Sequence, residues 1–400
     1  MVIPFSHIYP PMNGGMLRCF HILEQLCKHF QVTALMMQDK ESFLKATEEY
    51  PAIKNCKLLS TEDNQEVKDI FSLLPVKYRN AGRFRFWNRS LSEPAENNYL
   101  VLYPQLKDFL KTKRVDFIIL EDMAILNLAK LIKRFQPSIP VIYDAYNINS
   151  ILAASAFKKG VIGERQYKGI FKTESTLHNL VKNVFTCSEA DLDKIMEMNH
   201  NKIQGAVIPN GVSIPSESLN EGWGSMNILF CGSLDYLPNQ EGLLWFCRDV
   251  FPLILRQLPV AKLLVVGKGN PGESLSVFLD HPSVINYGQV DKVDKYYRKS
   301  AMAIVPLLSG SGTRLKLLEA MSLKVPVVST KPGAEGINYS DMKNILIAEG
   351  IEFFANGVIE ILSNPPMAKS IAENAFKFVQ NEYDWNIVGE KIYKYLNTLN

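Results

Sequence analysis

The chain has 400 residues, of which 47% are hydrophobic and 21% charged, and its formal net charge is +3. This length favours two domains of ordinary size. The composition excludes a disordered chain, because enough apolar side chains are present to form a core. The small net charge offers no argument for binding nucleic acid, so any electrostatic partner would have to be met by a local patch.

The N-terminus and the cysteines predict a cytoplasmic protein. No lysine or arginine precedes Arg18, and Pro4 and His7 interrupt the first apolar run, so we expect no signal peptide. No stretch approaches the roughly 18 uncharged apolar residues that cross a bilayer. The six cysteines form no C-x-x-C pair and have no histidine at zinc spacing. We therefore expect reduced thiols and no metal site.

Short aliphatic or β-branched runs alternate with longer helical segments along the whole chain. In the first half we predict strands at 31–37, 116–122, 140–146, 183–188 and 205–211. In the second half we predict strands at 226–233, 262–269, 284–290, 302–307, 325–330 and 344–349. The predicted helices include 16–28, 104–112, 189–198, 239–257, 291–299 and 313–322. Continuous apolar strands separated by helices predict α/β domains whose parallel sheets are covered on both faces.

A polar stretch rich in turn formers, at 212–225, is the predicted linker between two halves. We predict a first domain at 1–211 and a second at 226–383. Each would be a doubly wound, Rossmann-like domain that binds ligands at the carboxyl ends of its strands. The amphipathic stretch 384–400 predicts a C-terminal helix that packs back on the first domain.

The stretch SGSGTRLKLLEA, residues 309–320, joins a predicted strand to a predicted helix. Its glycines let backbone amides approach a ligand closely, and the amides of a helix N-terminus favour an anion. Arg314 and Lys316 fall in the first helical turn, where positive charge is unfavourable unless an anion such as a diphosphate lies there. Glu319, one turn further, is placed to accept hydrogen bonds from ribose hydroxyls. The alternative is a plain turn with a surface Lys316–Glu319 ion pair.

Four further loops with glycine or small polar residues follow predicted strands. One is PPMNGG, before the first helix, and the others lie near 232, 267 and 289. Each alone is an ordinary strand-to-helix loop. Because the carboxyl ends of parallel strands meet at one edge of a sheet, the loops together predict a nucleotide site.

These motifs resemble a known family. The ordered series FCGSLDYLPNQEG, LLVVGKGN, YGQVDK and SGSGTRLKLLEAM is similar to the donor domain of the retaining GT-B glycosyltransferases, glycosyltransferase family four. PPMNGG and VIPNGV extend the resemblance to essentially the whole chain. The resemblance implies an acceptor-binding first domain and a donor-binding second domain. It also implies transfer of a sugar from a nucleotide-sugar with retention, without a catalytic metal or a cofactor other than the donor substrate.

The resemblance also carries roles onto individual residues. It implies catalytic roles for Asp144, Tyr146, Arg314, Lys316 and Glu319. It implies donor contacts from Gly14, Gly15, Gly232, Ser233, Gly267, Gln289, Val290, Ser309, Gly310, Ser311, Gly312, Thr313, Arg314, Lys316, Leu317 and Glu319.

Three departures from the family pattern bear on the chemistry. Ser311 stands where the first of two glutamates is usual. The loop GSLDYLPNQEG lacks the lysine and arginine that the family tends to place there, so we infer that Arg314 and Lys316 supply the charge that meets the diphosphate. Tyr146 occupies a position where related sequences often carry a histidine facing the reacting sugar. The alternative for Asp144 and Tyr146 is a purely structural strand end.

The segment KYRNAGRFRFWNR, residues 77–89, interleaves cations with aromatic residues and contains no acid. One interpretation is a solvated loop whose aromatic side chains pin it to the domain. The other is an acceptor or membrane-surface site built on Arg83, Arg85 and Trp87, since cations attract phosphate head groups and aromatic rings favour the interface.

The predicted function is that of a hexosyltransferase. It would move a hexose from a UDP- or GDP-linked donor to a glycan or lipid-linked glycan in cell-surface polysaccharide synthesis, in the cytoplasm or on the inner face of the membrane. The alternatives are a nucleotide-sugar epimerase and a catalytically degenerate scaffold subunit, the latter motivated by Ser311 and Tyr146. A dinucleotide oxidoreductase is disfavoured, because no G-x-G-x-x-G with a downstream acid follows either first strand.

Overall fold

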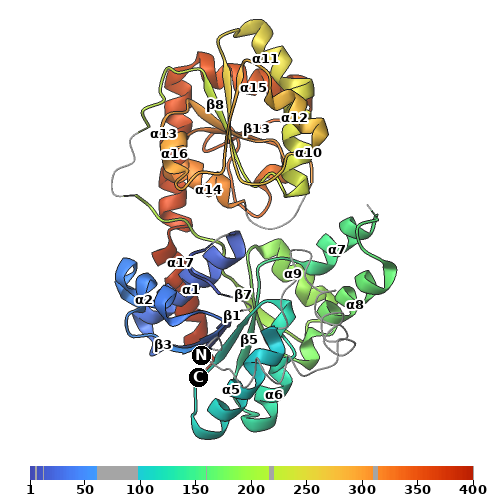
Figure 1. Cartoon of the computed structure of the whole chain (residues 1–400), viewed down its shortest axis with the longest axis vertical. Helices are drawn as coiled ribbons and strands as arrows, with labels where there is room; N and C mark the ends of the chain where they lie inside the picture. The colour runs from blue at the N-terminus through green and yellow to red at the C-terminus, as the bar shows by residue number, and fades with distance from the viewer. Residues whose placement is uncertain are drawn as a thin grey trace. The chain divides into compact units, whose positions relative to one another are not determined.

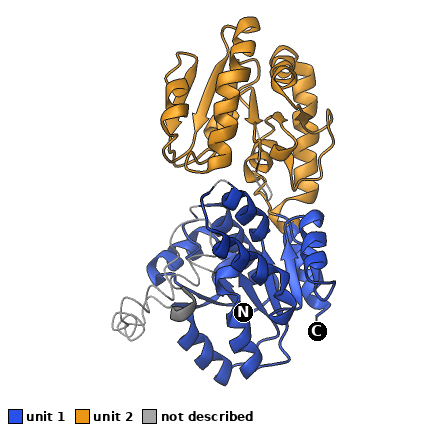
Figure 2. Cartoon of the chain, turned by 90° about the vertical axis from the view of Figure 1, so that its right-hand side faces the viewer, with its two compact units in different colours: residues 1–209, 388–400 blue, residues 210–387 orange. Residues whose placement is uncertain are grey.

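The computed structural model describes residues 1–4, 7–11, 13–60, 98–158, 160–215, 220–309 and 314–399. It consists of two compact units, shown in Figure 2. Unit 1 comprises Met1–Pro209 and Val388–Asn400, and unit 2 comprises Asn210–Ile387. Each unit contains one parallel β-sheet with helices on both of its faces (Figure 1), so the predicted α/β class is confirmed.

The sheet of unit 1 has seven strands in the order β3-β2-β1-β4-β5-β6-β7, all parallel. The strands are β1 (Val2–Pro4), β2 (Thr33–Met36), β3 (Lys57–Ser60), β4 (Ile118–Glu121), β5 (Val141–Ala145), β6 (Asn183–Thr186) and β7 (Gln204–Val207). The α-helices are α1 (Gly14–His29), α2 (Lys40–Glu49), α5 (Asn98–Thr112), α6 (Leu128–Phe135), α7 (Asn149–Lys158), α8 (Glu164–Ser175) and α9 (Glu189–Met198). No range was predicted for β1, which was expected only as the strand before the PPMNGG loop, and β3 was not predicted. β1 offers only Val2 and Ile3 before Pro4, and β3 only Leu58 and Leu59 between Lys57 and Ser60, too few apolar residues to show a period.

The sheet of unit 2 has six parallel strands in the order β10-β9-β8-β11-β12-β13. The strands are β8 (Asn227–Cys231), β9 (Lys262–Val266), β10 (Val284–Gly288), β11 (Met302–Val305), β12 (Val327–Ser329) and β13 (Leu346–Ile347). The α-helices are α10 (Leu237–Trp245), α11 (Phe251–Gln257), α12 (Glu273–Leu279), α13 (Asp294–Arg298), α14 (Leu315–Ser322), α15 (Ile351–Ser363) and α16 (Pro365–Glu382). The single helix predicted at 239–257 is interrupted by a π-helical turn, Phe246–Val250, just before Pro252, which has no amide hydrogen to continue the α pattern.

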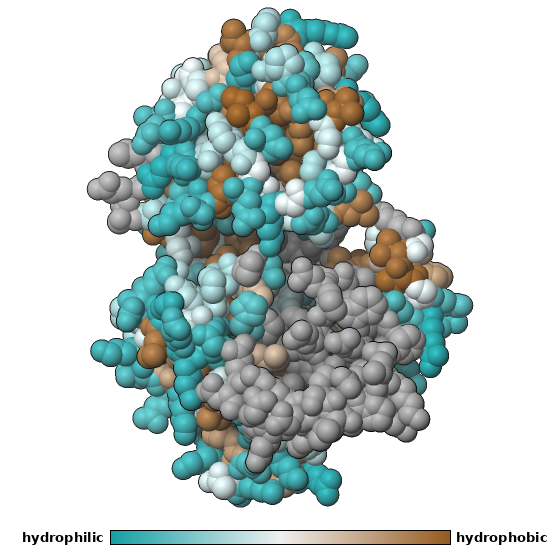
Figure 3. Space-filling view, in the orientation of Figure 1, coloured by the Kyte–Doolittle hydropathy of each residue, from teal (hydrophilic) through white to brown (hydrophobic). Residues whose placement is uncertain are grey.

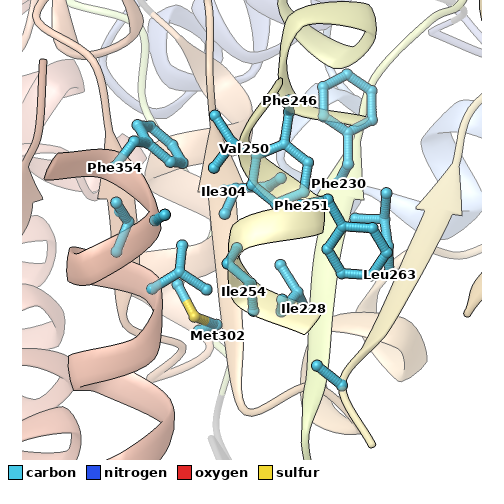
Figure 4. Packing of buried hydrophobic residues seen from close by; sticks show 14 of the residues in the cluster. Ile228, Phe230, Phe246, Val250, Phe251, Ile254, Leu263, Met302, Ile304 and Phe354 are labelled. Carbon is cyan, nitrogen blue, oxygen red and sulfur yellow. The ribbon is translucent and has the colours of Figure 1, made fainter. Parts of the chain in front are cut away.

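Both faces of the unit 2 sheet are covered by apolar packing. On one face, side chains from β8, β9 and β11 pack with the segment 246–254 and α15, as Figure 4 shows. On the other face the apolar side of α14, including Leu318 and Met321, belongs to a second buried cluster that also contains Leu229 of β8. Successive residues of a strand point to opposite faces, so Phe230 faces the first core while Leu229 faces the second. This double covering fixes the carboxyl end of β8, where the predicted nucleotide loop begins.

The last helix, α17 (Trp385–Asn397), starts in unit 2 and continues into unit 1. At its start the Trp385 amide donates to Val212, and a Cβ on Gly211 would lie 2.5 Å from the Trp385 ring. Further along, Tyr393 stacks on His29 of α1 with ring centroids 4.6 Å apart. Gly389 lies against Gln25 of α1, where a Cβ would come within 2.6 Å of Oε1. The part of α17 that belongs to unit 1 therefore packs on α1.

Candidate functional site

Two glycine-bearing loops touch at the carboxyl edge of the unit 2 sheet. The Gly232 amide donates to Val266 at 2.9 Å, and a Cβ placed on Gly267 would lie only 1.9 Å from the Gly232 carbonyl oxygen. A Cβ on Gly232 would lie 2.6 Å from Nζ of Lys316 and 2.8 Å from Nδ2 of Asn239. The absence of side chains at both glycines is therefore what lets the loops and Lys316 approach one another.

Lys316 presents a cation directly beneath the Gly232 loop. Its ammonium donates to Oδ1 of Asn239 at 2.7 Å and lies 4.8 Å from the centroid of the Phe230 ring. Burial lowers the pKa of Lys316 to about 8. The ammonium is turned toward Asn239 rather than Glu319, so the alternative of a surface Lys316–Glu319 ion pair is wrong. A half-buried cation whose direct partners are an amide and an aromatic ring retains the capacity to bind an anion.

Arg314 immediately precedes α14 and is buried. Its guanidinium donates to the Pro332 carbonyl at 3.3 and 3.4 Å, and it lies 3.8 Å from the Glu335 carboxylate. Burial lowers the pKa of Arg314, but an arginine remains charged at any working pH. Arg314 therefore connects the start of α14 to the loop that follows β12.

Glu319 lies one turn after Lys316 on α14. The hydroxyl of Tyr297, from α13, lies 3.4 Å from Oε2 of Glu319 and 3.1 Å from the Lys316 carbonyl oxygen. Burial raises the pKa of Glu319. Tyr297 is a residue that the sequence reasoning missed. In DKYYRKS it looks like any core tyrosine, and only the structure shows that its hydroxyl reaches two groups of α14.

The remaining residues predicted to contact the donor are placed differently. Gln289 and Val290 follow β10, at the same edge of the sheet as Gly267. The Ser309 hydroxyl donates to Glu241 at 3.3 Å. Leu317 is fully buried in the core beneath α14, so we correct its predicted donor contact to a packing role. Several predicted residues lie outside the described part of the chain: Gly310, Ser311, Gly312, Thr313, Arg83, Arg85 and Trp87.

In unit 1, Asp144 forms a buried ion pair with Arg18 at the end of β5. Nε and Nη2 of Arg18 reach the two carboxylate oxygens at 2.8 and 2.6 Å, and both side chains are at most 1% exposed. The pair ties α1 to β5 in a bidentate geometry. The structure leaves the Asp144 carboxylate no surface at which to meet a sugar, so we correct its predicted catalytic role to a positioning role.

Glu121 lies beside this pair, in register with Asp144 on the neighbouring strand β4. It is fully buried, and neither carboxyl oxygen has a hydrogen-bond partner. Burial raises the pKa of Glu121 well above its ordinary value. Asp144 is the carboxylate that contacts the Arg18 guanidinium directly.

The Tyr146 hydroxyl is held by the carboxylate of Asp122, a residue that the sequence reasoning missed. Its hydroxyl donates to Oδ2 of Asp122 at 2.5 Å, and Oδ1 of Asp122 accepts from the Ala124 amide at 2.6 Å. Asp122 has a φ of 127°, a strained conformation that is found mainly at functional sites. A Cβ on Gly15 would lie 3.5 Å from the Tyr146 ring, so the predicted PPMNGG loop and Tyr146 are neighbours. Gly14 begins α1 after the N-cap Asn13.

The described residues show neither a cluster of metal ligands nor a helix able to cross a membrane. Within the described ranges, no three histidine, cysteine or acidic side chains gather as a metal site would require. None of the helices in the described part of the chain combines the length and apolarity needed to cross a bilayer.

Sequence comparisons match parts of the chain. Residues 225–364 match the family model described as glycosyl transferases group 1. A Klebsiella pneumoniae protein, described as an uncharacterized 44.6 kDa protein in a cps region, is 31% identical over 175 residues. That match covers 42% of this chain and 45% of the relative, so it spans less than half the length of either protein.

Solved structures of the same fold cover nearly the whole chain. The crystal structure of HepE from Anabaena with UDP and glucose aligns over 99% of both chains, with a TM-score of 0.65 and 13% identity. Sucrose-phosphate synthase from Thermosynechococcus elongatus aligns over 100% of this chain and 98% of its own, with a TM-score of 0.68 and 14% identity. These likenesses confirm the predicted GT-B fold.

Proposed function

We propose that this chain, whose second unit carries a group 1 glycosyltransferase domain in a GT-B fold, transfers a hexose from a nucleotide-sugar to an acceptor hydroxyl. The observation that carries the proposal is Lys316, a cation fixed by Asn239 under the glycine loop of β8. UDP-linked donors are the first to test, because the HepE structure contains UDP and glucose. A GDP-linked donor and membership of glycosyltransferase family four belong to the same proposal.

In the proposed complex the donor diphosphate lies against the Gly232–Ser233 loop and accepts hydrogen bonds from Lys316. The loop GSLDYLPNQEG contains no lysine or arginine, so the charge comes from α14 instead. Arg314 adds a second positive charge at the start of the same helix. The cations stabilise the negative charge that develops on the leaving diphosphate, as oxyanion-binding groups do in other enzymes.

Glu319 is the proposed ribose-binding residue. Tyr297 holds one carboxyl oxygen, which leaves the other to accept from a hydroxyl group. Burial raises the pKa of this carboxyl, and two vicinal hydroxyls would supply the hydrogen bonds that favour its ionised form.

The proposed reaction proceeds with retention and without a metal. The acceptor oxygen attacks the anomeric carbon on the face that the diphosphate leaves, the bond between that carbon and the phosphate oxygen breaks, and the hydroxyl proton moves to the departing phosphate. Tyr146, fixed by Asp122, is the proposed unit 1 group at the reacting sugar. The proposed acceptor is a glycan or lipid-linked glycan of a cell-surface polysaccharide, reached from the cytoplasm.

Calorimetric titration with UDP and GDP tests the donor site, each with EDTA and with magnesium. Micromolar, metal-independent binding of one nucleotide is expected, with large losses in Lys316→Met and Glu319→Ala. The matched control is Lys262→Met, at the opposite end of the neighbouring strand β9. Binding of neither nucleotide would refute the donor site. Binding followed by a free altered sugar-nucleotide without acceptor would indicate an epimerase, and binding without transfer would indicate a scaffold.

A further inference from the structure

The hairpin of α7 and α8 in unit 1 carries an apolar cluster on its surface. Phe157 is 39% exposed, Phe171 is 45% exposed, and Val161, between the two helices, is 67% exposed. Figure 3 shows apolar side chains gathered on the protrusion formed by these helices, surrounded by hydrophilic residues. We call Phe157, Val161, Tyr167 and Phe171 the hairpin patch.

Aromatic contacts hold the hairpin patch in one arrangement. Phe157 of α7 stacks on Tyr167 of α8 with centroids 5.5 Å apart and an interplanar angle of 5°. Tyr167 in turn contacts Phe171, one turn further along α8, at 6.3 Å. These stacked rings share their apolar faces while part of each ring remains in water.

The turn and the base of the hairpin are also fixed. The Val161 amide donates to Ala156 at 2.9 Å and the Gly160 amide to Phe157 at 3.0 Å, which is the Schellman pattern with Gly160 at a φ of +70°. At the base, the buried Glu174 of α8 accepts from the amides of Asn149 and Ser150 at 2.7 and 2.8 Å and so caps the start of α7. The patch is therefore held exposed by a defined scaffold.

The hairpin is strongly basic. Residues 149–175 contain five lysines or arginines and two glutamates, a net charge of +3 that equals the formal charge of the whole chain. Of the two glutamates, Glu174 is buried at the base and Glu164 pairs with Lys168 at 2.6 Å. Lys168 and Lys172 lie one turn apart on α8, and Lys168 lies one turn before Phe171 on the helix surface. Lys158 directly follows Phe157 and is exposed.

The combination of exposed aromatic side chains and lysines on the hairpin fits a lipid surface better than a protein partner. The centre of a protein interface is depleted of lysine, so exposed aromatic rings on helices that also carry several lysines are a poor match to one. An anionic bilayer attracts basic residues and accommodates aromatic and aliphatic side chains at its interface. We propose that the hairpin patch and its lysines dock this protein on an anionic lipid surface.

The inference goes beyond the proposed transfer reaction and rests on different residues. If the acceptor is lipid-linked, docking would raise its local concentration at the enzyme. The docking itself requires neither donor nor acceptor, so it can fail while donor binding succeeds, or succeed while donor binding fails.

Co-sedimentation with vesicles is the direct test. The protein should pellet with vesicles of equal parts phosphatidylcholine and phosphatidylglycerol and remain in solution with phosphatidylcholine alone. The double variant Lys168→Gln/Lys172→Gln should partition more weakly by about fivefold for each lysine removed. Phe157→Ser/Phe171→Ser should lose most of the binding that persists at high salt, because salt screens the lysines but not apolar insertion.

Matched controls come from unit 2. Lys369 and Lys377, both exposed on α16, receive the same Lys→Gln changes, and Phe353, 71% exposed on α15, receives Phe→Ser. These controls should bind vesicles like the unaltered protein. UDP titration of every variant checks that unit 2 is intact. The proposal would be overturned if the protein bound neutral vesicles equally well, or if the hairpin variants bound like the unaltered protein. It would also be overturned if the protein formed a dimer without lipid and these variants dissociated that dimer.

Discussion

The affinity of the donor site for UDP should fall as the pH rises through 8, because Lys316 loses its proton there. Burial is the main cause of the lowered pKa, and the nearby Arg314 lowers it further, while Glu319 opposes the shift. Burial raises the pKa of the Cys231 thiol to about 12, so that group stays neutral over the whole window. Lys316 is therefore expected to lose its charge near pH 8.

The magnitude follows from the protonated fraction. With a pKa of about 8, the charged fraction falls from about 0.9 at pH 7 to about 0.1 at pH 9, and the apparent Kd rises by about tenfold in proportion. Removing the cation altogether removes a charged hydrogen bond, about 2–3 kcal/mol or roughly 30- to 150-fold in Kd. Lys316→Met should therefore bind weakly at every pH.

Titration calorimetry at a series of pH values measures this directly. Lys316→Arg is the matched control, because arginine keeps its charge throughout and should flatten the pH profile while retaining binding. The reasoning is refuted if Lys316→Met keeps the pH dependence of the unaltered protein, or if the unaltered protein binds equally at pH 7 and pH 9.

Three further outcomes are expected. The pKa of Lys316 is about 8 in the folded protein, below its ordinary value of 10.5. Between pH 8 and 10.5 the folded protein therefore binds fewer protons than the unfolded chain, so the free energy of unfolding of the ligand-free protein should rise with pH over this range. Denaturant unfolding measures this, and Lys316→Met should lack the rise. Asp144→Asn should cost about 3–5 kcal/mol of stability, because it leaves the Arg18 charge buried without a counterion, and the double change Arg18→Met/Asp144→Leu should recover much of it in thermal unfolding. Tyr146→Phe and Asp122→Asn should lower the kcat of transfer with UDP affinity unchanged; an unchanged kcat would return both residues to a structural role.

The fold was predictable because parallel strands buried on both faces are long apolar runs. The six predicted strands of the second half all appear, from β8 to β13, with only their ends shortened. β1 and β3 gave no such run, since β1 has only Val2 and Ile3 before Pro4 and β3 only Leu58 and Leu59 between polar residues. The break at Phe246–Val250 was also missed, because a π-turn leaves the apolar pattern of the helix unchanged and only Pro252 marks it.

The site was predictable where residue types determine the backbone, and unpredictable where partners are distant in sequence. Glycine at 232 and 267 follows from a loop that must approach another, so the sequence identified both. Tyr297 and Asp122 escaped, because each matters only through a partner more than twenty residues away, Glu319 and Tyr146 respectively. Asp144 shows the converse error, since a strand-end carboxylate looks the same in sequence whether it meets a ligand or a buried arginine.

The position of the Lys316 ammonium depends on the absence of a side chain at Gly232. Since φ at Gly232 is not positive, alanine is compatible with the backbone, but its Cβ would meet Lys316 Nζ and Asn239 Nδ2 at 2.6 and 2.8 Å. Both atoms end flexible side chains, so Gly232→Ala should fold and displace the ammonium instead. UDP affinity should fall as it does in Lys316→Met.

A double-mutant cycle distinguishes this displacement from general damage to the loop. If Gly232→Ala acts by moving the ammonium, its effect on UDP affinity should nearly vanish once Lys316 is methionine. The loss of binding free energy in the double variant should then be far smaller than the sum of the losses in the two single variants. Independent losses would mean that alanine at 232 disturbs the loop itself rather than the position of Lys316.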